Sequence, residues 1–175
     1  MPASSPKSQL AGFLAKFSPP VARRARAILA AMRQRLPGAL ELVYDNYNAL
    51  AIGFGPTERV SDVIFSIAVY PRWVSLFFFR GKGLPDPKRV LRGEGSQVRH
   101  IVLDGPEDLD IPAVKALIRV ALEQAIRPLD REQKSRVVIK SVSSKQRPRR
   151  PIGEDVVIKQ PRTAASRKRI NRASR

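Results

Sequence analysis

Apolar residues recur at helical spacing in two long segments of the chain. The segment Pro20–Leu36 carries them at intervals of three, four and one residues, which places them on one stripe of a helix. Ser18 is the expected N-cap, and Pro37-Gly38 ends the helix. A second stripe, from about Asp110 through Arg127, predicts a final helix before Pro128. A shorter helix over about residues 8–17 is compatible with the residues ahead of the first stripe.

Between these helices the pattern changes to short apolar runs bounded by turn residues. Four or five runs predict strands, at about Leu40–Tyr44, Ala49–Phe54, Val63–Tyr70, Trp73–Arg80 and Val98–Leu103. Short loops cannot connect parallel neighbours, so consecutive strands are expected to pair antiparallel, with both helices on one face of the sheet. The predicted fold class is therefore α+β, a two-layer sandwich with an antiparallel sheet of about five strands.

Both faces of the predicted sheet are rich in apolar residues. In the run after Pro71, the residues Trp73, Ser75, Phe77 and Phe79 alternate onto one face, while Val74, Leu76 and Phe78 take the other. A face without helices that carries rings indicates simple core packing, a homodimer interface or a ligand groove. For a groove, the expected lining consists of Tyr70, Trp73, Phe77 and Arg99, beside the glycine-containing loop 81–95.

Charge is distributed unevenly along the chain. The 175 residues hold 33 Lys+Arg and 15 Asp+Glu, for a net charge of +18. Residues 131–175 hold 15 of these cations, three acidic residues and no aromatic residue, a composition typical of disorder. We therefore expect an N-terminal arm over 1–19, a domain over 20–130 and a basic disordered tail over 131–175. Two short apolar tetrads, 137–140 and 156–159, could each add a strand when a partner is present.

Arginine is the main cation of this tail, and guanidinium groups neutralise phosphates and release counterions. The tail predicts association with nucleic acid or another polyanion, without base stacking and therefore without sequence selectivity. The alternative is a tail that only raises solubility. The residues expected to bind are Arg147, Arg149, Arg150, Arg167, Lys168, Arg169, Arg172 and Arg175.

Several kinds of chemistry are excluded by composition. The chain has no Cys and one His, His100, which rules out thiolate sites and histidine-cluster metal sites. No nucleophile or acid/base pair can be named, and the glycines of Gly81-Lys82-Gly83 fit turns better than a phosphate loop. The sequence thus predicts no catalytic residue, metal or cofactor. The N-terminus shows neither a signal peptide nor a membrane anchor, so a cytoplasmic protein without membrane contact is expected.

The central blocks resemble a known family. The run Leu42-Val43-Tyr44-Asp45-Asn46-Tyr47, the segment Tyr70–Phe78, the loop Gly81–Pro87 and the strand Val98–Ile101 are similar in order and spacing to the YdhG-like family (domain of unknown function 1801). The resemblance covers about residues 20–127 and implies a compact α+β domain of frataxin-like shape, without an assigned activity. One branch of that family is regarded as an iron chaperone.

Iron binding fits the first predicted helix poorly, because iron requires oxygen ligands and that helix carries five Arg and no acidic residue between Pro20 and Leu36. The acidic group Glu107-Asp108-Asp110 is better explained as loop and cap residues of the last helix. The leading hypothesis is a non-enzymatic YdhG-like domain with a polyanion-binding tail. The alternative is a small-ligand or iron-carrier domain in which the tail is incidental.

Overall fold

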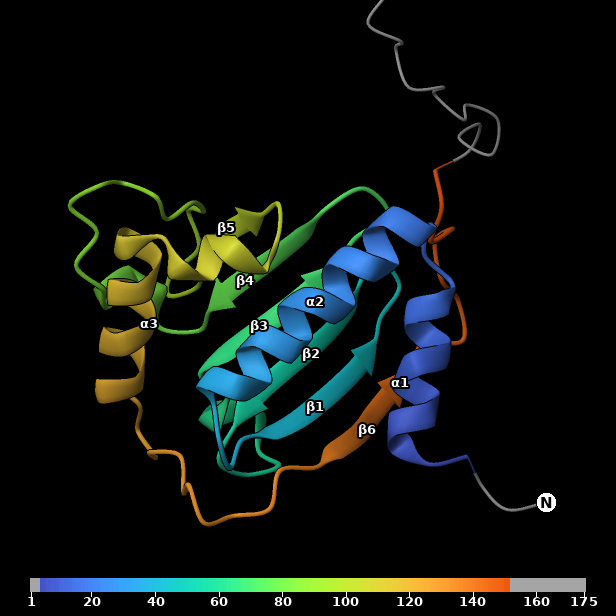
Figure 1. Cartoon of the computed structure of the whole chain (residues 1–175), viewed down its shortest axis with the longest axis horizontal. Coiled ribbons are helices and arrows are strands. Elements are labelled where there is room, and N and C mark those ends of the chain that lie inside the picture. The colour runs from blue at the N-terminus through green and yellow to red at the C-terminus, as the bar shows by residue number, and fades with distance from the viewer. Residues whose placement is uncertain (1–3, 152–175) are drawn as a thin grey trace, which may run out of the picture.

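Helices cover one side of the sheet in the computed structural model, which describes residues 4–151 (Figure 1). The helices are α1 (Pro6–Ala15), α2 (Pro19–Arg35) and α3 (Pro112–Glu123). Prolines occupy the first positions of all three, where a missing N–H costs no helical hydrogen bond. Ser18 is the N-cap residue of α2, as its position before Pro19 predicts.

The strands form one sheet in the order β5-β4-β3-β2-β1-β6. Neighbours from β1 to β5 pair antiparallel, as the short connections require. The α+β class and the pairing of consecutive strands are thus confirmed. The strand bounds are β1 (Leu40–Asp45), β2 (Leu50–Gly55), β3 (Phe65–Val69), β4 (Val74–Phe78), β5 (Arg99–Leu103) and β6 (Val137–Val142).

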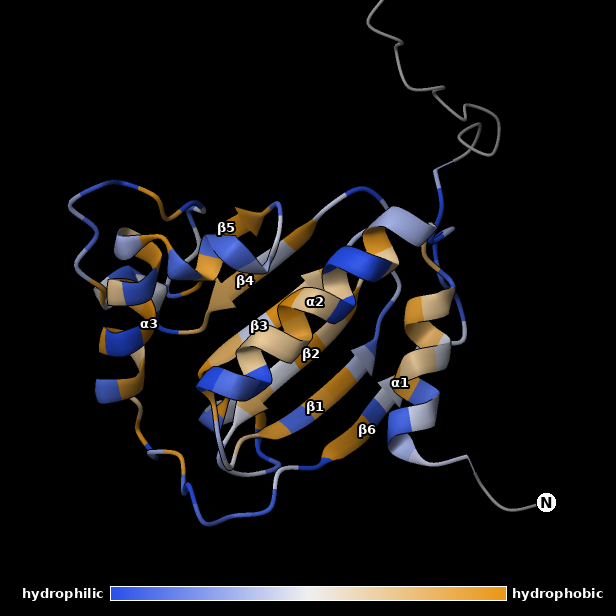
Figure 2. Cartoon of the chain, viewed as in Figure 1, coloured by the Kyte–Doolittle hydropathy of each residue, from blue (hydrophilic) through white to orange (hydrophobic). Residues whose placement is uncertain are grey.

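One continuous core joins the helices to the sheet. Alternate strand residues such as Ile52, Ile67 and Leu76 are fully buried, and they pack with Ile28 and Met32 of α2 in one cluster. The same cluster takes in residues from α1 and α3, so all three helices cover the same face. Figure 2 shows the hydrophobic residues gathered on the strands and the helices, while the connecting loops are largely hydrophilic.

The sixth strand corrects the expectation of disorder from residue 131 onward. In β6, residues Val137 to Val142 pair parallel with β1, and a register shift leaves Lys140 as the extra residue of a bulge. Figure 1 shows β6 at the edge of the sheet beside β1. Over residues 4–151 the sheet is therefore mixed and has six strands. The apolar tetrad at 137–140 does add a strand, and its partner is this chain's own first strand; the second tetrad, at 156–159, lies outside the described residues.

The segment ahead of β6 is also held in place. The Gln133 side chain donates hydrogen bonds to the carbonyl oxygens of Gly38, at 2.7 Å, and Pro56, at 3.1 Å. Gly38 has a positive φ of 81°, and a side-chain carbon there would collide with the main chain of Asp130. These contacts make residues 131–151 part of the folded domain.

Among the described residues, no helix is long and apolar enough to cross a membrane.

Candidate functional site

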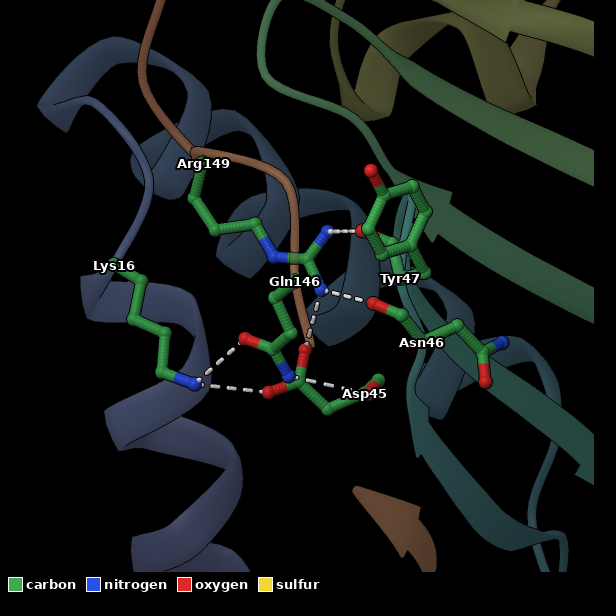
Figure 3. A network of polar contacts seen from close by, with 6 residues as sticks. All are labelled: Lys16, Asp45, Asn46, Tyr47, Gln146 and Arg149. Atoms are coloured by element: carbon green, nitrogen blue, oxygen red, sulfur yellow. Dashed lines mark hydrogen bonds and ion pairs between the residues drawn. The ribbon is translucent and has the colours of Figure 1, made fainter. Parts of the chain in front are cut away.

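The chain that follows β6 is anchored by an ion pair in which both partners are buried. Arg149 Nη2 lies 2.7 Å from Asp45 Oδ1, and the two side chains are 3% and 1% exposed (Figure 3). Asp45 ends β1, so its carboxylate stands on the helix-covered face close to the start of the β1–β2 turn. The ion pair therefore ties the segment after β6 to the end of β1, across 104 residues of sequence.

Further donors surround the Asp45 carboxylate. Lys16, just after α1, places Nζ 2.9 Å from Asp45 Oδ2 and 3.2 Å from Gln146 Oε1. Burial alone would raise the Asp45 pKa, but hydrogen bonds from Lys16, Gln146 and Arg149 outweigh it and hold that pKa below its ordinary value. A carboxylate kept ionised in this way is suited to anchoring the chain, because a general base works best with a pKa near the working pH.

Arg149 is satisfied by the protein itself. Besides Asp45, its guanidinium donates to the carbonyl oxygens of Asn46 and Tyr47 in the β1–β2 turn. It also lies over the Phe17 ring, 5.5 Å from the centroid, although its Nε atom is buried without a partner. This corrects the assignment of Arg149 to polyanion binding, since a buried, paired guanidinium is not open to a phosphate.

The neighbours of Arg149 are placed differently. Arg147 and Arg150 are exposed, and each makes one long side-chain hydrogen bond, to Asn48 Oδ1 at 3.5 Å and to the Lys16 carbonyl at 3.4 Å. Their backbone is held by the Arg147 N–H, which donates to the Tyr47 carbonyl at 2.9 Å. Burial of Arg149 thus holds the backbone on either side of it, and the side chains of Arg147 and Arg150 extend from this backbone to the surface. The remaining predicted polyanion-binding residues, Arg167, Lys168, Arg169, Arg172 and Arg175, lie outside the described residues.

Arg147 and Arg150 border a hollow of about 510 Å³, which we call the cationic hollow. Its opposite wall is the β3–β4 hairpin, where Tyr70 and Trp73 stack with ring centroids 4.9 Å apart. Trp73 is 43% exposed, which makes it one of the large apolar side chains most open to solvent. The full lining consists of Asn48, Tyr70, Pro71, Arg72, Trp73, Arg147, Pro148, Arg150 and Pro151.

A second hollow, of about 410 Å³, lies on the sheet face that carries no helix, and we call it the sheet-face hollow. Strand register puts Ala51, Ser66 and Phe77 on this face. Small side chains in the middle strands form the floor, and rings stand around them. Its lining consists of Asn46, Tyr47, Asn48, Ala49, Ala51, Ser66, Ala68, Tyr70, Phe77, Phe79 and Val98.

The four predicted groove residues are only partly brought together. Tyr70 and Phe77 line the sheet-face hollow, and Trp73 lines the cationic hollow beside it. Arg99 stands opposite Phe78 in the β4–β5 register and so belongs to the helix-covered face, where its guanidinium donates to the carbonyls of Gly95 and Val98. Arg99 therefore does not join the rings.

The glycine loop is shaped by close packing and turns. A side-chain carbon at Gly81 would lie 2.5 Å from Arg99 Cβ, and Gly93 has a positive φ of 109°. Asp86 accepts hydrogen bonds from the main-chain N–H groups of Val90 and Leu91 and so closes the loop. These observations favour turn geometry for the glycines, as the sequence indicates.

Most of the excess positive charge belongs to the part of the chain that the structure describes. Residues 131–151 contain eight Lys+Arg and one acidic residue, and residues 152–175 contain seven and two. The first 151 residues therefore carry +13 of the net +18. The sequence pattern located the basic residues but not the aromatic residues beside them, because Trp73 and Arg147 are neighbours only in the folded chain.

The acidic residues considered for metal binding are engaged elsewhere. Asp110 pairs with Arg35 at 2.6 Å, and Asp108 Oδ2 accepts the Asp104 main-chain N–H. Within residues 4–151, no three His, Cys, Asp or Glu side chains gather as a metal-binding group.

No family model, curated protein or solved structure matches this chain.

Proposed function

We propose that this protein is a non-enzymatic domain, YdhG-like in its sequence blocks, that associates with nucleic acid or another polyanion through its basic C-terminal region. The observation that carries the proposal is the cationic hollow, where Arg147 and Arg150 are held outward by the buried Arg149–Asp45 pair. Because the backbone that carries these arginines is held, it loses little freedom when the guanidinium groups contact a phosphate. The rest of the basic chain continues from Pro151, which lines the same hollow.

Binding of this kind is governed by charge. Each phosphate neutralised on duplex DNA contributes about −0.9 to the slope of log K against log salt concentration. The footprint of the folded domain is expected to include Arg147 and Arg150, and the basic cluster 167–169 is expected to add to it. Because contacts to phosphates carry no base-sequence information, affinity is expected to vary little with base sequence.

The test uses the full chain, since residues 131–151 belong to the fold. Duplex DNA binding is measured across a salt series for Arg147→Gln with Arg150→Gln, and for Arg167→Gln, Lys168→Gln with Arg169→Gln. Both variants are expected to bind more weakly with a flatter slope. The matched control is Arg23→Gln with Arg26→Gln, which removes two exposed arginines of α2 that do not line the cationic hollow. An unchanged slope in both test variants, or a loss only in the control, contradicts the proposal.

A second candidate function is a small-ligand carrier, favoured by the sheet-face hollow of about 410 Å³ with its rings Tyr70 and Phe77. Native mass spectrometry of the purified chain tests it, since a carrier retains a small molecule of defined mass. An iron carrier is favoured less, because the outer surface of α2 presents the exposed arginines Arg23 and Arg26.

A further inference from the structure

The Tyr70–Trp73 pair connects the two hollows. Tyr70 lines both of them, and Trp73 stacks on it at an interplanar angle of 21° with nearly half of its surface exposed. On one side of this pair are Arg147 and Arg150, and on the other side is the ring-lined sheet face. Cationic groups and flat apolar surfaces are therefore adjacent on one continuous stretch of the protein.

The sheet-face hollow combines rings with a few polar groups. Phe77 and Tyr47 supply apolar surface, and Tyr47 is 52% exposed. The amides of Asn46 and Asn48 and the hydroxyl of Ser66 supply donors and acceptors. A nucleobase is the matching chemistry, because it has two flat faces and a polar edge, and its backbone phosphate would lie toward the arginines.

We infer that the two hollows together bind unpaired nucleobases of a single-stranded nucleic acid, an inference that rests on the proposed polyanion function. Bases stack on the exposed aromatic rings, first on Trp73, while Arg147 and Arg150 contact the backbone. Bases in a duplex are already stacked on each other and cannot offer their faces to these rings. The protein therefore prefers single strands to duplexes at equal salt, which charge alone does not provide.

The experiment compares three probes on the full chain: an oligothymidylate of about 12 nucleotides, a duplex of matched length, and inorganic polyphosphate. Trp73 is the only tryptophan, so stacking of a base on it is read directly as quenching of its fluorescence. Oligothymidylate is expected to quench that emission, and polyphosphate is expected to bind without quenching it.

Two substitutions separate stacking from charge. Trp73→Ala is expected to weaken oligothymidylate binding about tenfold, as for loss of one stacked base, and to leave duplex and polyphosphate binding unchanged. Trp73→Phe keeps a flat ring and is expected to restore most of the affinity. Ile126→Ala is the control, because Ile126 is 57% exposed and lines neither hollow. Circular dichroism verifies that each variant is folded.

The outcomes distinguish the two proposals. Equal losses for all three probes in Trp73→Ala, or no loss for oligothymidylate, overturn the single-strand inference and leave the polyanion function standing. Absence of binding to every probe overturns the polyanion function itself. A dimer in sedimentation velocity that dissociates in Trp73→Ala shows that a second copy covers the rings, and this result also overturns the inference.

Discussion

The two faces of the sheet are built from the same strands but from different side chains. The helix-covered face carries large residues such as Leu76 and Phe78, fully buried under α2 and its neighbours. The open face carries small residues such as Ala51 and Ala68, with partly exposed rings around them. The covered face therefore holds most of the buried core, while the open face has a smaller buried cluster of Leu40, Leu42 and Val63. A substitution among the exposed rings of the open face is expected to leave the main core intact.

The largest expected effect comes from the charged corner of the covered face. Asp45→Ala leaves the guanidinium of Arg149 buried without its carboxylate, which is expected to lower the free energy of unfolding by about 3–5 kcal/mol. Urea unfolding followed by circular dichroism measures it. Because Lys16 is 43% exposed, its amine can turn to water and adds little to the loss.

A double variant controls for this interpretation. Asp45→Leu with Arg149→Met removes both charges and keeps apolar bulk, so it is expected to recover much of the lost stability. If the double variant is as unstable as Asp45→Ala, the contribution of the pair is not electrostatic.

Adjacent residues of β4 give the next largest contrast. Leu76 is fully buried on the covered face, and Leu76→Ala is expected to cost about 2–5 kcal/mol of unfolding free energy. Phe77 faces the open side and stacks on His100 at 5.1 Å, and Phe77→Ala is expected to cost about 1 kcal/mol. Urea unfolding of the two variants side by side tests the contrast. Equal costs would show that both faces are structural core.

The smallest expected effects are in the pH dependence of stability, and they differ between the faces. On the open face, burial and the charge of Arg92 lower the pKa of His100 below its ordinary value of 6.5. As the pH falls through 6.5, His100 is therefore protonated in the unfolded chain before it is protonated in the folded chain, and the fold loses stability. On the covered face, the lowered Asp45 pKa gives stability above its ordinary value of 3.8 that is lost below it. Both groups therefore destabilise the fold on acidification, but in separate windows.

Unfolding free energies measured from pH 8 to pH 3 check this. His100→Gln is expected to flatten only the near-neutral part of the profile, and Asp45→Asn only the acidic part. A single variant that flattens both parts would mean that the two groups are coupled through the sheet.

Local patterns predicted the covered face and failed where contacts are distant. Alternation in the run after Pro71 put Val74, Leu76 and Phe78 on one face, and all three are fully buried in the core that the helices cover. In contrast, β6 has only a short apolar run among charged and Ser residues, and its partner β1 lies at the other end of the sequence. No local sequence pattern predicts the Arg149–Asp45 pair, or that Trp73 and Arg147 line the same cationic hollow. Periodicity indicates which side of an element is buried, but it does not identify the residues that cover that side.

The place of β6 has a consequence for newly made protein. Until Val137–Val142 arrive, β1 is an edge strand whose free N–H and C=O groups can pair with another molecule. Because β6 is among the last parts of the fold to be synthesised, each nascent chain passes through a stage in which β1 is unpaired on that side and can aggregate with other chains. The bulge at Lys140 then puts a lysine on the strand that forms the final edge, a feature that discourages further strand addition.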